Sequence, residues 1–366
     1  MTERVRVEII CSQALEEDFA EEFENNNVGK KFTKIANVMG AGWSNPHLGD
    51  AVWPQLNTMY IIYCDKEESE KIIMQIRYWK DRIAGYVMAA LAAGAMLLVV
   101  ALGVGLYLKA APILHEQSLW SLLTSTEWKP MQGQFGFLPF LAGTCAVTLV
   151  SVILALPLSL LMAIYLSEYA GRRLRSLSSS LLDILAGLPS VIYGVWGTLL
   201  IIPWISDWLA PLLGKTSGGY TLLAGGIVLG VMIIPLMTSL FTELFRNVPR
   251  QLSEASLALG STRWQTIKFV VMRKSLAGII ATVVLAVSRA LGETIAIMMV
   301  CGNLPVIPKL LLDACYPLPA LIANNYGEML SVPMYESALM LAALILFVLV
   351  LVFNLGARLV LRKIHK

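Results

Sequence analysis

Charged residues are scarce in this sequence of 366 residues: they make up 14% of it, whereas 57% of the residues are hydrophobic. A soluble globular protein has about 25% charged residues, so the scarcity excludes one ordinary soluble enzyme. Most of the apolar side chains are therefore expected to face lipid. The net charge of +3 does not indicate nucleic-acid binding, because the basic residues cluster beside apolar segments instead of lining one soluble face.

Several chemical signatures are also missing. The five cysteines contain no CxxC pair and have no histidine neighbours, so the sequence predicts neither a metal site nor a disulfide framework, only small buried side chains. No GxxxxGK[ST] segment is present, so we expect no ATP hydrolysis by this chain. No motif assembles a nucleophile, a base and an orienting group, which argues against an enzyme. The first 80 residues carry no basic segment followed by a short apolar one, so no cleaved signal peptide is expected.

Long apolar segments are what the sequence has instead. A helix needs about 20 apolar residues to cross some 30 Å of hydrocarbon. The sequence predicts six such spans, which lie at 83–108, 138–166, 179–203, 220–245, 275–301 and 336–360. We therefore expect a mainly α membrane domain of six transmembrane helices over residues 81–366.

Basic residues predict the orientation of these spans, because Lys and Arg are retained on the cytoplasmic side. With the N-terminus inside, four basic residues fall on the outer side: Lys109, Lys129, Lys215 and Lys309. Sixteen fall on the inner side: Arg77, Lys80, Arg82, Arg172, Arg173, Arg175, Arg246, Arg250, Arg263, Lys268, Arg273, Lys274, Arg358, Arg362, Lys363 and Lys366. The asymmetry predicts that both termini are cytoplasmic. It also places Trp120, Trp128, Trp204 and Trp208 near the outer interface as aromatic anchors.

Residues 1–80 lack the long apolar segments of the rest of the chain, and their pattern predicts a small cytoplasmic α/β domain. Strands are expected at 5–11, 32–39 and 58–64, and helices at 15–24 and 67–79. Between the second and third strands lies a long loop, 40–57, rich in Gly, Pro and Trp. A loop of that length in so small a domain is usually functional. The domain is either a sensor or only a tether and assembly handle.

The cytoplasmic segment 246–274 is expected to form two short helices that meet at an angle. Pro249 suits a helix start, Gly260 a helix end, and Thr262 with Gln265 a capping box for the next helix. Small and apolar residues at 255–259 give the first helix a surface that fits a cleft of a soluble partner. The alternative is an amphipathic loop on the lipid surface.

Two charged residues interrupt the fifth predicted span. Arg289 and Glu293 are four residues apart and are expected on one face of that helix. An arginine at the centre of a span costs about 2.5–3.5 kcal/mol, so it usually faces a pathway or a protein partner. A guanidinium matches a tetrahedral oxyanion through paired hydrogen bonds. The alternative is a static salt bridge.

Glu254, Ala255, Ser256 and Gly260 resemble the EAA loop of ABC-importer permeases, although Ser256 replaces the second alanine of the pattern and residues 270–273 lack its closing proline. The resemblance implies that this loop docks into an ATPase subunit.

The string 289–294 (RALGET) is similar to the phosphate-specific permeases, and 297–303 (IMMVCGN) to their PstC-type member. Further similar segments are 188–197 in the third span, 233–235 in the fourth and 336–338 in the sixth. The glycines of 188–197 either loosen a helix beside the pathway or serve helix packing. This resemblance implies a phosphate importer with Arg289 and Glu293 in the substrate pathway. Its implied partners are a second, PstA-type permease, two ATPase subunits that use ATP, and an external phosphate-binding protein. We expect no cofactor on this chain itself.

Residues 36–50, with 53–54 and 58–60, look like a nitrogen-regulatory PII-like domain, a ferredoxin-like fold, although the last strand of that fold is missing. The resemblance makes Trp43, His47 and Asp50 a candidate effector loop. His47 and Asp50 could ligate a metal, but a single loop histidine is more often solvated, so we predict no metal site.

Two other functions compete with a phosphate permease. A permease for another oxyanion would keep the coupling loop but is expected to lack the pair Arg289 and Glu293. A membrane-anchored sensor that only displays the PII-like domain would have no need for the segment 254–260.

Overall fold

The computed structural model describes residues 4–12, 31–38, 57–327 and 334–364. The chain divides into two compact units, residues 1–99 and 100–366, and each is described by itself. The division falls inside one helix, α2 (Lys66–Glu116). The expected domain boundary at residue 80 lies in the same helix. The expected residues of the candidate effector loop, Trp43, His47 and Asp50, and the expected helix 15–24 lie outside the described residues.

Unit 1 is built on a three-stranded antiparallel sheet. Its strands are β1 (Arg4–Ser12), β2 (Phe32–Val38) and β3 (Asn57–Asp65), in the order β1-β3-β2. Alternate β3 residues, Tyr60, Ile62 and Cys64, are buried with Ile9 of β1 and Ile72 of α2, as the period of two along a strand requires. The three expected strands are confirmed, and this order is that of a ferredoxin-like sheet. In the described part, no fourth strand lies beside β1.

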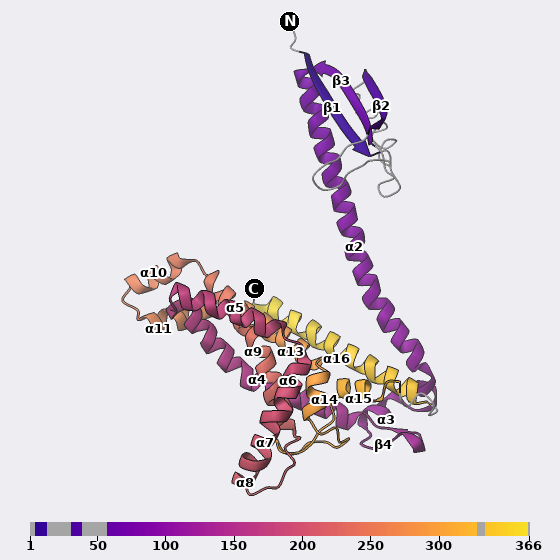
Figure 1. Cartoon of the computed structure of the whole chain (residues 1–366), viewed down its shortest axis with the longest axis vertical. Coiled ribbons are helices and arrows are strands. Elements are labelled where there is room, and N and C mark those ends of the chain that lie inside the picture. Colours follow the sequence, from indigo (N-terminus) through magenta and orange to yellow (C-terminus); the bar gives the residue numbers. More distant parts are fainter. Residues whose placement is uncertain (1–3, 13–30, 39–56, 328–333, 365–366) are drawn as a thin grey trace. The chain divides into compact units, whose positions relative to one another are not determined.

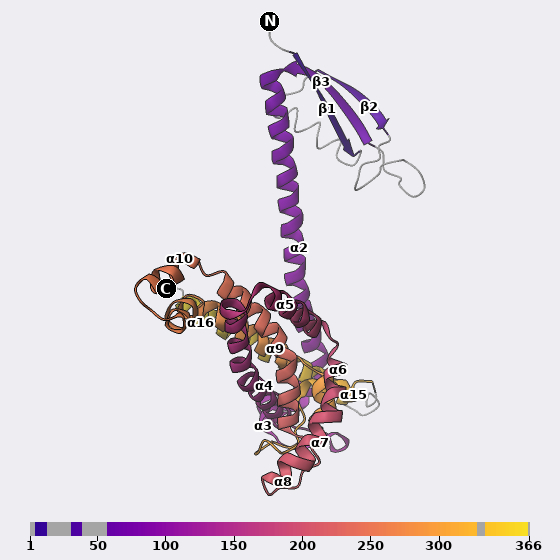
Figure 2. The same cartoon turned by 60° about the vertical axis from the view of Figure 1, so that its left-hand side comes forward.

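Unit 2 is a helical bundle (Figures 1 and 2). Its shorter elements before α9 are α3 (Leu119–Thr124), the hairpin β4 (Trp128–Lys129) and β5 (Gln134–Phe135) around a turn at Pro130–Gln132, α5 (Arg172–Gly187), α6 (Ser190–Trp196), α7 (Ile202–Trp204) and α8 (Ala210–Leu212). One-turn π-helices at Gly197–Ile201 and Ile205–Leu209 join α6, α7 and α8 into one helical rod. The long helices are α4 (Leu138–Ile164), continued by a π-turn at Tyr165–Tyr169, α9 (Leu222–Arg246) and α16 (Tyr335–Ile364).

The remaining helices follow α9 along the chain. They are α10 (Arg250–Ala258), α11 (Arg263–Thr266), a π-turn at Ile267–Val271, α12 (Met272–Lys274), α13 (Leu276–Leu291), α14 (Ile295–Val300) and α15 (Leu318–Asn325). In both views α10 and α8 lie at opposite ends of the bundle (Figures 1 and 2). We call these the α10 end and the α8 end.

Five helices of the described part are long and apolar enough to cross a membrane: Ala84–Glu116, Leu138–Tyr169, Ser190–Leu212, Leu222–Arg246 and Tyr335–Leu359. A sixth candidate is a bent pair, Arg263–Lys274 with Leu276–Leu291, whose two halves meet at 69°. The first, second, fourth and sixth predicted spans therefore have long-helix counterparts.

Two predicted spans differ from the structure. The third was expected at 179–203, but α5 ends at Gly187 and the next helix begins only at Ser190. Pro189 explains the break, because a proline disfavours helical geometry in the residue before it, and Leu188 is extended. The fifth, expected at 275–301, is interrupted between Leu291 and Ile295.

The packing of α4 against α9 forms the centre of unit 2, where the two helices run side by side (Figure 1). Three glycines of α9 make the close approach possible. A Cβ placed on Gly226 would collide with the Val150 side chain of α4, and one on Gly230 would lie 3.3 Å from the Ser151 carbonyl oxygen. Small residues allow helix backbones to approach closely in lipid, where no hydrophobic effect drives helices together.

A second cluster, at the α8 end, is aromatic. The Trp128 ring lies 4.9 Å from the Phe140 ring and 5.6 Å from the Phe135 ring, centroid to centroid. Trp128 was expected near the outer interface as an anchor, and its ring is partly buried among these aromatic side chains. Trp120 and Trp208, by contrast, are both 75% exposed, as anchors require.

The glycine face of α9 generates a prediction. Gly226→Val should lower the free energy of unfolding by about 1–3 kcal/mol, because the added side chain overpacks the contact with Val150. Thermal denaturation of the purified protein in detergent measures this. The matched control is Gly105→Val in α2, where a Cβ meets nothing within 4 Å. Equal stability of the two variants would contradict the packing role of the glycine.

Candidate functional site

The segment between α9 and α13 folds as two short helices joined at an angle, as expected. α10 follows Pro249 and holds Glu254, Ala255 and Ser256. Gly260 follows it with φ of +85°, a left-handed conformation that glycine adopts without strain. The expected capping box is present: the Thr262 hydroxyl accepts from the Gln265 N–H, and the Gln265 side chain accepts from the Thr262 N–H.

The α10 surface is left uncovered by the rest of unit 2. Glu254, Ala255 and Leu257 are exposed, and Leu259 is 88% exposed. The helix is nevertheless fixed to its neighbour, because the Ser256 and Thr266 hydroxyls hydrogen-bond at 3.0 Å. Ser256, which departs from the second alanine of the resembled pattern, therefore supplies a link between α10 and α11 that an alanine could not make.

A cluster of arginine contacts, which the sequence did not reveal, ties this loop to the end of the second span. The Arg263 guanidinium donates to the Glu168 carbonyl and lies over the Tyr169 ring, 4.9 Å from its centroid. Arg175 of α5 donates to the carbonyls of Leu166, Ser167 and Ala170, at 2.8, 2.7 and 3.2 Å. The last carbonyls of a helix have no partner within it. Arg175 thus caps the helix that Arg263 contacts.

The loop also leads directly into α13. The helix Arg263–Lys274 and α13 meet at Ser275 with a bend of 69°. At the far end of α13 lies Arg289, so one helix joins the exposed loop to the charged residues of the fifth span. The coupling loop and Arg289 are therefore joined by one continuous and largely helical stretch of the chain.

Arg289 and Glu293 do not share one helical face, and that expectation is wrong. α13 ends at Leu291, with Gly292 as its C-cap, and α14 begins at Ile295. Within the described residues, neither side chain has an ion-pair or hydrogen-bond partner, so the structure holds no Arg289–Glu293 salt bridge. The Arg289 side chain is exposed in unit 2, and Glu293 is partly buried.

The glycine-rich third span packs tightly against α14 and α9. A Cβ on Gly194 would lie 2.6 Å from the Met299 sulfur, and one on Gly197 would lie 2.5 Å from a Val228 methyl. These two glycines therefore serve helix packing, the alternative that the sequence left open. The Tyr193 hydroxyl donates to the Leu185 carbonyl at 2.7 Å and so bridges the break at Pro189.

A hollow of about 540 Å³ opens at the α8 end, beside the end of α14. Its lining residues come from the segment before α9, from α14 and from the segment after α14: Ser217, Gly218, Tyr220, Met298, Met299, Gly302, Asn303, Leu304, Leu312 and Ala314. The sequence singled out 297–303 as a motif but gave no sign of the hollow. Residues 302–314, distant from 217–220 in the sequence, complete its wall.

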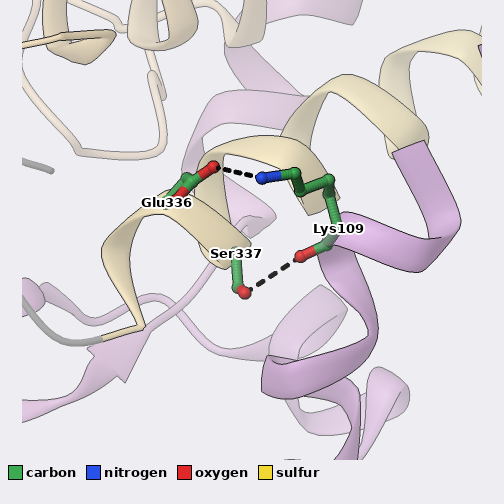
Figure 3. Close-up of polar contacts among 3 residues, drawn as sticks. All are labelled: Lys109, Glu336 and Ser337. Atoms are coloured by element: carbon green, nitrogen blue, oxygen red, sulfur yellow. Dashed lines mark hydrogen bonds and ion pairs between the residues drawn. The ribbon is translucent and has the colours of Figure 1, made fainter. Parts of the chain in front are cut away.

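The start of α16 is tied to the end of α2 at the same end of the bundle (Figure 3). The Lys109 ammonium lies 3.0 Å from a Glu336 carboxylate oxygen, and the Ser337 hydroxyl donates to the Lys109 carbonyl at 3.0 Å. The ion pair is exposed on both sides and contributes about 0–1 kcal/mol. The sequence motif at 336–338 thus has a structural role in joining the first and last spans.

Comparisons with known proteins agree with this arrangement. Residues 155–366 match the family described as binding-protein-dependent transport system inner membrane component. The chain is 35% identical over 260 residues to the phosphate transport system permease protein PstC of Xylella fastidiosa, which covers 67% of this chain and 80% of that protein. It is 37% identical over 239 residues to the probable ABC transporter permease protein YqgH of Bacillus subtilis, covering 64% of this chain and 75% of that protein.

Among solved structures, a bacterial alginate ABC transporter in complex with a pentasaccharide-bound periplasmic protein includes a chain with a TM-score of 0.56 at 15% identity. The match covers 79% of this chain and 99% of that one. At so low an identity, the likeness shows the fold alone.

The arginine cap generates a prediction. Arg175→Met should lower the free energy of unfolding by about 1–3 kcal/mol, because three carbonyls lose their donor. Arg172→Met removes the same charge one turn earlier on α5, from an exposed side chain, and should change stability by less than about 0.5 kcal/mol. Thermal unfolding of both purified variants measures the difference. Similar losses in the two would show that only the charge matters.

Proposed function

The chain belongs to the family of binding-protein-dependent transport system inner membrane components, and from that membership we propose that it is a permease subunit of an ATP-driven phosphate importer. It is not an enzyme but a multi-pass protein of the inner membrane. Its relatives in Xylella fastidiosa and Mesorhizobium japonicum, at 35% and 34% identity, carry the name of phosphate transport permeases. The structural observation that best supports the proposal is Arg289, beside the break of the fifth span. Its side chain has no ion-pair or hydrogen-bond partner among the described residues.

Arg289 is suited to a passing oxyanion. Its side chain is exposed in an apolar segment and has no ion-pair partner among the described residues. Facing lipid would cost about 2.5–3.5 kcal/mol, so a water-filled path or a second permease is the favourable surrounding. The planar guanidinium offers paired donors that match two oxygens of a phosphate. Glu293 lies within the break, four residues after Arg289, and is partly buried.

Broken helix backbone beside Arg289 favours the same role. Residues 292–294 lie outside any helix, and such a break is tolerated at membrane depth only where protein or water covers it. A substrate path is lined by protein and filled with water, and it also gives the backbone room to rearrange. Arg289 therefore stands just before this non-helical segment, and Glu293 lies within it.

We assign α10 to ATPase docking. Its exposed residues Ala255, Leu257 and Leu259 form a small apolar surface of the kind that inserts into a cleft. ATP hydrolysis then belongs to two partner ATPase subunits. A second, PstA-type permease completes the translocation path, and an external phosphate-binding protein delivers the substrate.

The docking assignment fixes the orientation, since ATP is used in the cytoplasm. The α10 end then faces the cytoplasm and the α8 end faces outward, with both termini inside. The basic residues at the α10 end, among them Arg175, Arg250 and Arg263, support this orientation through the positive-inside rule. The hollow at the α8 end is then open to the external binding protein.

Movement of α10 can reach Arg289 through named contacts. A pull on α10 acts on α11 through the Ser256–Thr266 hydrogen bond and then on α13 through the 69° bend at Ser275. Arg263, bound to the end of the second span, is the pivot that resists this pull. A rotation of α13 then changes which side of the membrane Arg289 faces.

Unit 1 is proposed to regulate transport. Its sheet order agrees with a ferredoxin-like domain, and α2 continues without interruption from that sheet into the first span. A change in the soluble unit can therefore reach the membrane through one helix. The effector site, with Trp43, His47 and Asp50 as its candidate residues, remains a prediction of the sequence.

The substrate assignment generates a prediction. In proteoliposomes that contain the partner permease, the ATPase and the binding protein, Arg289→Ala should abolish ATP-dependent phosphate uptake. Arg289→Lys should reduce it at least about tenfold, equivalent to ~1.4 kcal/mol, because an ammonium lacks the planar fork. Glu293→Gln should also lower uptake. Arg358→Lys, an exposed arginine near the end of α16, is the control and should leave uptake unchanged.

Assembly of each variant is checked by size-exclusion chromatography before uptake is compared. Full uptake by an assembled Arg289→Lys complex would remove the oxyanion role. Accumulation of another oxyanion in place of phosphate by the native complex would favour the second candidate, a permease of different selectivity.

A further inference from the structure

Two cysteines that are 14 positions apart in the sequence, Cys301 and Cys315, meet at the α8 end. Cys301 follows α14, and Cys315 stands three residues before α15. The Cys315 N–H donates to the Cys301 carbonyl at 2.9 Å, and Gly302 pairs with Cys315 in a parallel β-bridge. The backbones of the two cysteines are therefore directly hydrogen-bonded, and a disulfide spans Cα atoms about 4.4–6.8 Å apart.

The two side chains are buried in the same cluster. Both residues have 0% exposure, and both are free thiols in the structure. Neighbouring backbone closes around them, since a Cβ on Gly225 would collide with the Cys301 sulfur and one on Gly143 would lie 3.5 Å from the Cys315 Cβ. The two cysteines therefore share one closed site.

Whether the two thiols become oxidised depends on which side of the membrane they face. This step rests on the proposed function and on the orientation that follows from it. With α10 in the cytoplasm, residues 301–317 lie at the outer face. Disulfides form and persist outside the cytoplasm, whereas thiols stay reduced inside it. Neighbouring thiols on the outer side of a membrane are thus in the compartment that oxidises them.

We propose that Cys301 and Cys315 form a disulfide bond that closes the outer loop 302–314. The bond forms by exchange with a disulfide-bonded protein oxidant: two thiols lose two protons and two electrons, and the oxidant is reduced to its dithiol. Because both sulfurs are buried in the folded protein, the exchange takes place during folding, before the loop closes over them.

The loop closed by this bond supports both the hollow and the start of α9. The Leu222 and Leu223 N–H groups, which have no partner inside α9, donate to the carbonyls of Asp313 and Leu311 at 2.8 and 2.9 Å. The Asp313 carboxylate accepts from the Lys309 and Leu310 N–H groups at 2.9 and 2.8 Å, which holds the loop in a turn. The same loop supplies Asn303, Leu304, Leu312 and Ala314 to the hollow. The disulfide therefore fixes the wall that faces the binding protein.

Counting free thiols tests the proposal. The complex is extracted from membranes, denatured without reductant and treated with a polyethylene-glycol maleimide, which adds one gel shift per thiol. Of the five cysteines, the native chain should show three shifts, five less the bonded pair, and all five after reduction. Cys301→Ser should show four shifts with or without reductant, because Cys315 loses its partner. Cys145→Ser, the control, should show two before reduction and four after it.

Mass spectrometry of the non-reduced digest should then find the peptides of Cys301 and Cys315 joined. Five shifts in the native chain without reductant would overturn the proposal. Phosphate uptake by the same preparation separates the two claims. Uptake with five free thiols refutes the disulfide alone, whereas a disulfide without phosphate uptake refutes the proposed function alone.

Discussion

Lipid offers no water to unpaired backbone groups, and the rest of this structure depends on that constraint. Among the described residues, helices break within or beside apolar segments at Leu188 and Pro189, at 292–294 and at 301–317, among other places. The first and third of these breaks are partnered by other parts of unit 2. Tyr193 bridges the first, and the third satisfies the free N–H groups of α9. Glu293 lies in the second and Arg289 just before it, and neither has a partner within the described residues.

In the proposed function, that remaining break is where the substrate is recognised. Arg289 stands at the end of a helix whose other end bends by 69° into the loop that carries α10. Arginine contacts from Arg263 and Arg175 hold the base of the loop against the second span, so a force on α10 is directed along α13. The glycine face of α9 keeps the centre rigid while this helix moves. The proposed coupling loop and the proposed substrate residue therefore lie at the two ends of α13.

Local signals in the sequence were sufficient to predict much of the fold and of the coupling loop. Hydropathy predicted the long spans, and Pro249, Gly260 and the pair Thr262 and Gln265 predicted the ends of the coupling helices, because caps depend on residues that are near in sequence. The sequence missed what depends on distant residues. It merged part of α5 with the third span, since the amphipathic helix and the span are both rich in leucine. It carried the fifth span past Gly292, and it left Cys301 and Cys315 unpaired because only the returning loop brings them together.

Uptake by the native complex tests the central claim, that this permease moves phosphate at the expense of ATP. Labelled phosphate is supplied to proteoliposomes holding the complete complex, with and without ATP inside, and with excess sulfate or molybdate outside. The account predicts accumulation that requires ATP and persists in the presence of both competing oxyanions. Accumulation of sulfate or molybdate, but not phosphate, by the same assembled complex would contradict it.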